Sequence, residues 1–300
     1  MVSMKSSPRR SIPSALVLSL ASTAARLLPM QVKRAVYRSP RLARLIRQGL
    51  NRAAPQGSAE VTVAAGGLAG MRLSLDLQLE KDYWLGTYEP ELQAAIGQLV
   101  QPGNVAYDLG ANIGYISLLL ARRVGEPGLV YAFEALPGNL ERLRLNLALN
   151  GLENRVVLVP GAVGDSPQPV HFLVGPSGGT GKVAGSAGRQ EIDYPGEITV
   201  PGIILDEFVY QEGNPPPHVV KIDIEGGEVL ALSGMSRVLA EARPILFLEL
   251  HGPQASQVAW EVLLGSGYQI SRMVAGFPAV PSLQALDWKA YLVGFPLDSD

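Results

Sequence analysis

The chain has 300 residues, of which 47% are hydrophobic and 17% are charged, a composition that supports a folded protein with a sizeable core. It contains no cysteine, which excludes disulfides, thiolate nucleophiles and cysteine-ligated zinc. The net charge of −2 hides an uneven distribution, because residues 1–55 carry 11 of the 25 lysines and arginines and none of the 27 acids.

Residues 1–55 are therefore predicted to form a basic N-terminal extension of an acidic body, residues 56–300. The uncharged run 11–25 is too short to span a bilayer as a helix. Its composition faintly resembles a secretory signal and also fits an organelle transit peptide. Residues 30–50 alternate apolar and basic side chains at helical spacing. This pattern predicts a helix that either lies on an anionic membrane surface or packs against the acidic body.

The body follows a regular order of predicted elements. A hairpin of two short strands, 61–65 and 71–77, leads into a helix over 89–100. Apolar strands and amphipathic helices then alternate. The strands are predicted at 105–109, 129–133, 156–159, 170–174, 198–200, 219–224, 245–250, 268–274 and 290–295, and the helices at 113–124, 139–150, 229–239 and 255–264. The alternation predicts an α/β fold with a mostly parallel, seven-stranded Rossmann-like sheet and helices on both faces. Ligands of such sheets bind at the carboxyl ends of the strands.

One motif lies where the first core strand ends and the next helix begins, in the run Asp108-Leu-Gly-Ala-Asn-Ile-Gly114. Gly110 allows a sharp turn, and Asp108 either accepts hydrogen bonds from a ligand amine or orders the loop. The G-x-x-x-G spacing differs from the dinucleotide fingerprint G-x-G-x-x-G. A carboxylate in this turn repels a pyrophosphate but suits a cationic sulfonium. Glu134 ends the second strand, where a carboxylate accepts the hydroxyls of a ribose. Together these features favour S-adenosyl-L-methionine as the ligand.

The run Val105–Tyr115 resembles the donor-binding motif of FkbM-type methyltransferases. Further matching motifs follow at 133–137, Asn146, Asn150, 162–165, 205–207, 221–228, 243–244 and 249–251. The resemblance covers about residues 86–251, with Ala135 as one departure from the usual proline. It implies S-adenosyl-L-methionine as methyl donor and O-methylation of sugars, polyketides or other secondary metabolites. The donor-binding candidates are Asp108, Gly110, Asn112, Gly114, Glu134, Ala162 and Asp165.

Charged side chains alternate with apolar ones where two later strands end. Lys221, Asp223 and Glu225 are expected on one side of the first of these strands, and Glu249 and His251 on one side of the next. Burying such charges is costly unless they are paired or employed. Asp223, Glu249 and His251 are the catalytic candidates, with a general base that takes the proton of an acceptor hydroxyl.

Less specific interpretations of the same residues remain open. Lys221 can form a buried ion pair with Asp223 or Glu225 that only fixes the strand, and His251 can simply hydrogen-bond a loop. Asp223 and Glu249 are ligands that a divalent cation accepts, but two carboxylates are too few to predict a metal.

Three other features have two interpretations each. Asp165 can lie near the adenine edge, with Ala162 beside the ring, or can belong to a plain turn. Glu89 can face the acceptor or only cap its helix. Residues 175–188, with six glycines, can form a lid over substrate or a flexible surface loop.

The sequence thus predicts a cytoplasmic, S-adenosylmethionine-dependent methyltransferase that acts on a small-molecule or glycan hydroxyl. The acidic body excludes nucleic acid as a partner, because phosphate binding needs clustered positive charge. Peripheral membrane contact through the extension is a further expectation. The alternatives are a non-catalytic, membrane-associated scaffold of the same fold and a nicotinamide-dependent oxidoreductase.

Overall fold

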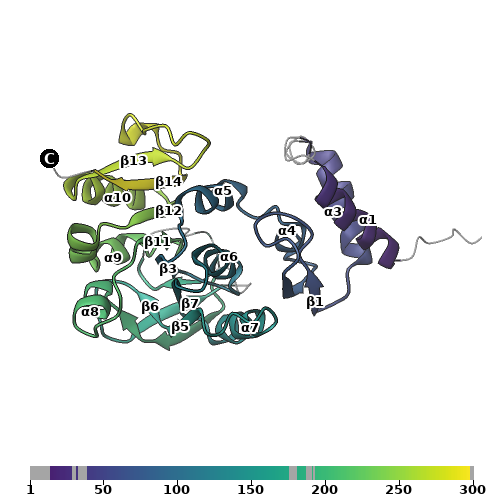
Figure 1. Ribbon diagram of the computed structural model, residues 1–300, viewed down its shortest axis with the longest axis horizontal. Coiled ribbons are helices and arrows are strands. Elements are labelled where there is room, and N and C mark those ends of the chain that lie inside the picture. Colours follow the sequence, from purple (N-terminus) through teal and green to yellow (C-terminus); the bar gives the residue numbers. More distant parts are fainter. Residues whose placement is uncertain are drawn as a thin grey trace, which may run out of the picture. The chain divides into compact units, whose positions relative to one another are not determined.

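The computed structural model describes residues 14–28, 32, 39–175, 181–186, 191 and 193–297. The chain forms two compact units, Met1–Tyr88 and Glu89–Asp300 (Figure 1). The sequence predicted a boundary at residue 55, whereas the structure has it at residue 88. The hairpin and the short helix that follow the basic extension belong to the same unit as the extension, and not to the body.

The first unit contains a pair of helices and a hairpin. Helices α1 (Ser14–Leu27) and α3 (Pro40–Ala53) pack against each other, and strands β1 (Ser58–Thr62) and β2 (Arg72–Asp76) form the predicted antiparallel hairpin. Helix α4 (Lys81–Leu85) closes the unit. The uncharged run of the sequence folds into most of α1, and the predicted helix over 30–50 begins at Pro40 among the described residues, since 33–38 lie outside them. No helix in the described ranges is long and apolar enough to cross a bilayer.

The second unit is built on a seven-stranded sheet, which confirms the predicted α/β fold. Its strand order is β13-β14-β12-β11-β3-β4-β5. The strands are β3 (Val105–Leu109), β4 (Leu129–Glu134), β5 (Val156–Pro160), β11 (Val219–Ile222), β12 (Ile245–His251), β13 (Tyr268–Arg272) and β14 (Lys289–Pro296). Five strands from β12 to β5 run parallel, and β14 is antiparallel to both of its neighbours.

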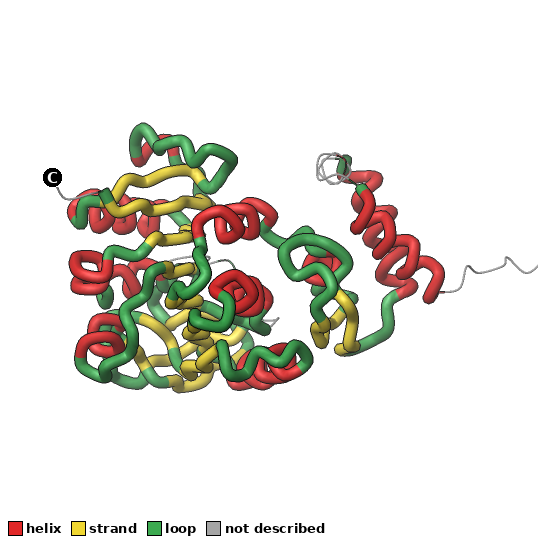
Figure 2. The backbone as a smooth tube through the Cα atoms, viewed as in Figure 1, coloured by secondary structure: helices red, strands yellow, loops and turns green. Residues whose placement is uncertain are grey.

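Helices cover both faces of this sheet, as Figure 2 shows. Helices α5 (Pro90–Leu99), α6 (Tyr115–Val124) and α7 (Pro137–Ala148) lie on one face, and α8 (Leu205–Tyr210), α9 (Glu228–Ser233) and α10 (Pro253–Gly265) on the other. The main hydrophobic core lies between the sheet and the helices α8, α9 and α10. There the Phe208 ring of α8 lies 5.2 Å from the Phe133 ring and 5.8 Å from the Tyr107 ring, within the range of favourable aromatic pairs.

Smaller strands flank the sheet. Strands β7 (Val170–Val174), β8 (Gly181–Val183) and β9 (Gly196–Val200) form a separate three-stranded sheet, and β6 (Ala162–Val163) pairs with β10 (Gly202–Ile203). Strand β8 lies within the glycine-rich segment. Residues 176–180 and 187–190 of that segment lie outside the described ranges, so neither interpretation of it is tested.

Two predicted elements end earlier than expected. The strand predicted over 219–224 stops at Ile222, and the helix predicted over 229–239 is split into α9 and a π-helical turn, Val238–Ala242. Helix α9 ends just before Gly234, where the backbone lies so close to another segment that a Cβ would be 2.0 Å from the Gly164 carbonyl oxygen.

Candidate functional site

The site lies at the carboxyl ends of β3 and β11, where the strand order reverses. Strand β3 continues through a connecting helix to β4 on one side, and β11 lies on its other side with Lys221 in register with Asp108. Such a switch point leaves a crevice between the diverging connections, and ligands of doubly wound sheets bind there.

Lys221 is the buried cation of the site. Its ammonium Nζ lies 3.2 Å from Asp108 Oδ1 and donates to the carbonyl oxygens of Gly110 (3.0 Å) and Leu109 (3.3 Å). Burial alone would lower the pKa of Lys221, but the carboxylates of Asp108, Asp223 and Glu89 together outweigh burial and raise it above its ordinary value. Lys221 therefore stays charged. From the sequence, Asp223 and Glu225 were the candidate ion-pair partners of Lys221. The structure places Asp108 closer to the ammonium than Asp223, whose Oδ2 lies 3.8 Å away.

Asp108 orders the loop of the glycine motif from inside. Its side chain is fully buried, and its Oδ2 accepts a hydrogen bond of 2.6 Å from Ser117 Oγ of α6. With Lys221 on its other oxygen, both oxygens have protein partners. Of the two roles that the sequence left open, ordering the loop is the one these contacts describe.

The two motif glycines are required by packing. Gly110 has φ +81°, and a Cβ there would lie 2.1 Å from the Asp223 carbonyl oxygen. Gly114 has φ +91°, and a Cβ there would lie 2.1 Å from Leu143 Cδ1 of α7. Both conformations favour glycine. Asn112, between them, also adopts a left-handed conformation with φ 51°.

Glu134 closes β4 beside this loop. Its carboxylate accepts hydrogen bonds from the backbone N–H groups of Asn112 (2.8 Å) and Leu136 (2.8 Å) and from Asn139 Nδ2 (3.3 Å). Burial raises the pKa of Glu134, and these hydrogen bonds act in the opposite direction. The loop reaches the same strand, since Gly110 and Ala111 both donate to the Phe133 carbonyl oxygen. A carboxylate fixed in this way can accept further hydroxyl donors, as a ribose diol requires.

The last donor-binding candidates lie beyond β5. The Gly161 N–H donates to the Glu134 carbonyl oxygen over 3.0 Å, so Ala162 follows directly beside the end of β4. Ala162 is buried with Ala135 and Val200 in a small apolar cluster. Asp165 is exposed. The structure thus brings Ala162, but not the Asp165 carboxylate, into a packed position.

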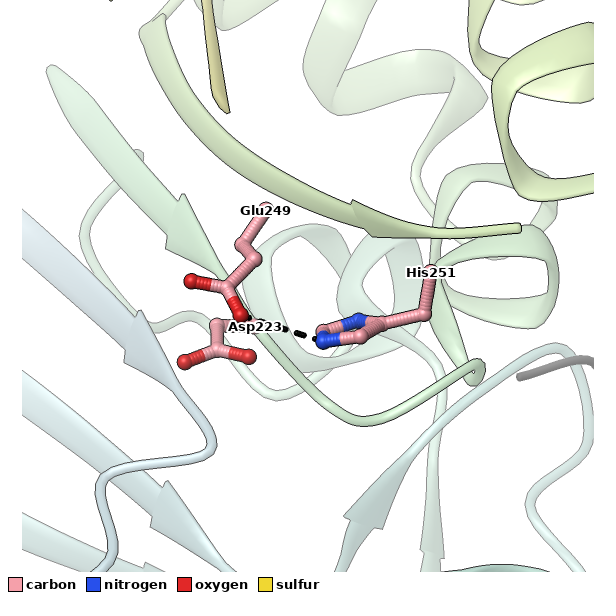
Figure 3. A group of neighbouring side chains, drawn as sticks. All are labelled: Asp223, Glu249 and His251. Atoms are coloured by element: carbon pink, nitrogen blue, oxygen red, sulfur yellow. Dashed lines mark ion pairs between the residues drawn. The ribbon is translucent and has the colours of Figure 1, made fainter. Parts of the chain in front are cut away.

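The three catalytic candidates converge, as Figure 3 shows, from the ends of the neighbouring strands β11 and β12. His251 is fully buried, and its Nδ1–H donates to Glu228 Oε1 over 2.9 Å. Its Nε2 lies 3.1 Å from Glu249 Oε1. Glu249 also forms an ion pair with Lys289 of β14. One ligand atom of each of Asp223, Glu249 and His251 lies within 4.8 Å of the others.

These contacts separate the pKa values of the three groups. Burial raises the pKa of Asp223 to about 8, against the opposing effect of Lys221 and with the support of Glu249. Burial alone would raise the pKa of Glu249, but the hydrogen bonds from His251 and Lys289 outweigh it and lower the value. Burial alone would lower the pKa of His251, but Glu228 and Glu249 raise it to about 10. At neutral pH the imidazole is thus a cation, and Asp223 is the carboxyl group that titrates nearest to neutrality.

A small cavity, partly open to solvent, lies beside this cluster. It is lined by Glu89, Leu92, Lys221, Ile222, Asp223, Phe247, Leu248, Glu249, Met273 and Tyr291. Glu89 precedes α5 and contributes to the cavity wall, which agrees with the acceptor-facing interpretation of this residue. The lining combines carboxylates with apolar and aromatic side chains, as small-molecule sites do.

Sequence reasoning missed three side chains of the site. Glu228 begins α9, is fully buried, and accepts from the Gly226 N–H as well as from His251. The sequence pattern that could have indicated Glu228 is an acidic residue directly after two glycines at the start of a helix, where the helix dipole favours negative charge. Lys289 and Tyr291 come from β14, and no local pattern indicates that this strand inserts beside β12.

Among known proteins, the sequence matches the family described as "Methyltransferase FkbM domain" over residues 108–275. It is 27% identical over 148 residues to a hexuronic acid methyltransferase of Haloferax volcanii, an alignment that covers 49% of this chain and 56% of that protein. The chain therefore spans little more than half of the length of that relative.

The fold of this chain is similar to that of several solved structures, including the following two. The FkbM methyltransferase of Methylobacillus flagellatus has 18% identity and a TM-score of 0.41, covering 73% of this chain and 53% of its own. A SAM-dependent O-methyltransferase of Thermotoga maritima has 13% identity and a TM-score of 0.40, covering 71% and 67%.

The substitution Lys221→Met tests the buried ion pair. It leaves Asp108 as an uncompensated buried charge, so we expect the free energy of unfolding to fall by about 3–5 kcal/mol, measured by urea denaturation. The double variant Asp108→Asn/Lys221→Met removes both charges and is expected to recover much of this loss. A double variant no more stable than the single one would contradict the pairing.

Proposed function

The chain belongs to the FkbM methyltransferase family, and on that premise we propose that it transfers a methyl group from S-adenosyl-L-methionine to a hydroxyl of a sugar, glycan or other small molecule. The observation that carries the proposal is that carboxylates lie at two places along one edge of the sheet. Glu134 lies beside the motif loop at the end of β4, and Asp223 and Glu249 lie beside the cavity at the ends of β11 and β12.

The residues at the end of β4 fit the donor. The Glu134 carboxylate is fixed by two backbone N–H groups and accepts the two ribose hydroxyls. Lys221 donates to the Gly110 carbonyl oxygen and forms an ion pair with Asp108, and these contacts hold the loop beside Glu134. S-adenosylmethionine supplies, when bound, an electrophilic methyl group on a sulfonium cation, and the acidic edge of the sheet favours that charge.

The residues at the ends of β11 and β12 fit the acceptor. Asp223 lines the cavity, and its raised pKa makes its ionised form a stronger base than an ordinary carboxylate. It accepts the proton as the acceptor oxygen forms its bond to the methyl carbon. Glu249 accepts a hydrogen bond from the acceptor, and His251, buried behind it, orients Glu249. Holding the hydroxyl in line contributes about 7–11 kcal/mol in favourable cases.

A sugar hydroxyl is the acceptor that the cavity favours. Carboxylates such as Glu89, Asp223 and Glu249 accept hydrogen bonds from several hydroxyl groups at once. The relative from Haloferax volcanii is named for a sugar acid, which supports a carbohydrate. Tyr291 and Phe247 provide the apolar part of the wall, against which the less polar face of a sugar ring packs.

The basic extension is proposed to hold this cytoplasmic enzyme on an anionic membrane surface. Helix α3 exposes Leu42 (44%), Leu45 (66%) and Ile46 (43%) along one side, while its arginines lie at Arg41, Arg44, Arg47 and Arg52. Apolar side chains on one face and arginines on the other are typical of helices that lie in the interface of anionic lipids.

Calorimetric titration with S-adenosylhomocysteine tests the donor site in the full chain. Glu134→Gln replaces one accepting oxygen by a donor group, so we expect binding to weaken by about 10- to 100-fold. Glu153→Gln, an exposed change of the same kind, is the matched control and keeps wild-type affinity. NAD is expected to give no heat. A folded wild-type protein that does not bind S-adenosylhomocysteine would overturn the proposed function.

Transfer of a radiolabelled methyl group to a panel of methyl glycosides and uronates tests the acceptor site. We expect Asp223→Asn to slow transfer by about 10²–10⁴-fold while S-adenosylhomocysteine still binds. The exposed change Asp193→Asn is expected to leave the rate unaltered. Equal rates for the wild type and Asp223→Asn would exclude Asp223 as the base.

Sedimentation with vesicles tests the membrane contact. Vesicles of equal parts phosphatidylglycerol and phosphatidylcholine are expected to bind the full chain, and vesicles of phosphatidylcholine alone to bind it weakly. Burial of one leucine contributes about 1.5–3 kcal/mol, so Leu42→Ser/Leu45→Ser is expected to lower binding at least tenfold. The matched control Leu145→Ser/Leu264→Ser alters leucines of similar exposure, 48% and 47%, in the other unit. Equal loss in both variants would argue against a specific role of α3.

A further inference from the structure

A second property of the cluster Asp223, Glu249 and His251 goes beyond proton transfer. Their ligand atoms lie within 4.8 Å of one another, and Figure 3 shows the three side chains facing the same small volume. Two carboxylate oxygens and one imidazole nitrogen form a donor set that divalent cations such as Mn²⁺ or Mg²⁺ accept. His251 is the third ligand, which the sequence pattern alone did not assign to a metal site.

One buried atom points independently to a missing ligand. Among the described residues, Glu249 Oε2 is buried and has no hydrogen-bond partner. His251 Nε2 lies beside it, with Glu249 Oε1 at 3.1 Å as its partner. The Glu249 side chain is only 7% exposed, so water does not readily satisfy Oε2. A buried polar atom without a partner is costly and requires an explanation, such as an absent ion.

The surroundings of His251 match those of a metal ligand. Its Nδ1–H donates to Glu228 Oε1 over 2.9 Å, and Glu228 is held in turn by the N–H groups of Ile224 and Gly226. This arrangement fixes the ring with Nε2 toward the other two ligands. A carboxylate behind the imidazole is the usual support of metal-binding histidines.

The charges around the cluster also favour a cation. Glu225 Oε2 lies 3.7 Å from His251 Nε2, and Glu228 adds a further carboxylate. Lys289 contacts Glu249 through Oε1, which leaves Oε2 for another partner. A cation at Nε2 displaces the proton that this nitrogen otherwise carries, as at other imidazole sites.

We propose that Asp223, Glu249 and His251 bind one divalent cation beside the acceptor cavity. The proposal that the cation binds follows from the geometry alone, whereas the role of the cation rests on the proposed function. There the ion would contact the acceptor oxygen, lower the pKa of the hydroxyl and hold it in place. The proton would pass to Asp223 or to water, and the acceptor oxygen would form its bond to the methyl carbon as the carbon–sulfur bond of the donor breaks and S-adenosylhomocysteine leaves.

The test is titration of EDTA-treated full-length protein with MnCl₂, followed by the loss of the electron paramagnetic resonance signal of free Mn²⁺. We expect one equivalent to bind. Asp223→Asn and Glu249→Gln each remove a ligand and are expected to weaken binding at least tenfold. Glu228→Gln removes the support of the imidazole and is expected to weaken it by about 10- to 100-fold. Glu241→Gln, an exposed change outside the cluster, is the control.

A second readout reports the position of the ion. The Trp288 ring lies 6.5 Å from the His251 ring, so bound Mn²⁺ is expected to quench its fluorescence, and Trp288→Phe to remove that change. Thermal melts and S-adenosylhomocysteine binding of each variant verify folding and the donor site separately. If the wild type binds S-adenosylhomocysteine but no Mn²⁺, or if all variants bind Mn²⁺ equally, the metal site is refuted while the proposed function stands.

Discussion

The buried ammonium of Lys221 holds the site together. It forms an ion pair with Asp108 in which both side chains are almost fully buried. It also binds the carbonyl oxygens of Leu109 and Gly110, while the N–H groups of Gly110 and Ala111 reach the Phe133 carbonyl on the opposite side. The loop is therefore fixed by β11 through its oxygens and by β4 through its nitrogens. Removing two charges from water is costly, and in this structure the buried pair holds the turn that contains Gly110.

The carboxylates at this edge of the sheet differ in how closely a cationic side chain approaches them. Asp108 has Lys221, Glu249 has Lys289, and Glu228 has the imidazole of His251. Asp223 has the weakest partner, since its Oδ2 lies 3.8 Å from a lysine that is already engaged. The carboxyl group with the least compensation is the one whose pKa rises to about 8. A buried carboxyl group with a pKa shifted in this way is typical of functional sites.

Much of this architecture is predictable from local patterns, and the limits of prediction have physical causes. The apolar strands and the convergence of Asp223 with Glu249 follow from strand alternation and from the adjacency of parallel strands. The contact between Glu228 and His251 does not, because it depends on a turn in which Glu225 adopts a left-handed conformation. Gly110 was expected to allow a sharp turn, and the Cβ positions show that the Asp223 backbone beside Gly110 and the Leu143 side chain beside Gly114 also favour glycine. Helix α1 was obscured by a composition that resembles targeting segments.

Strand β14 brings the late part of the chain to the cavity. It delivers Lys289 and Tyr291 to the cavity wall, although the family match ends at residue 275. In the proposed function the donor side of the site is built on β3 and β4, and the acceptor side on β11, β12 and this late strand. A substitution in β14 can therefore change the wall of the cavity while the strands of the proposed donor side stay as they are.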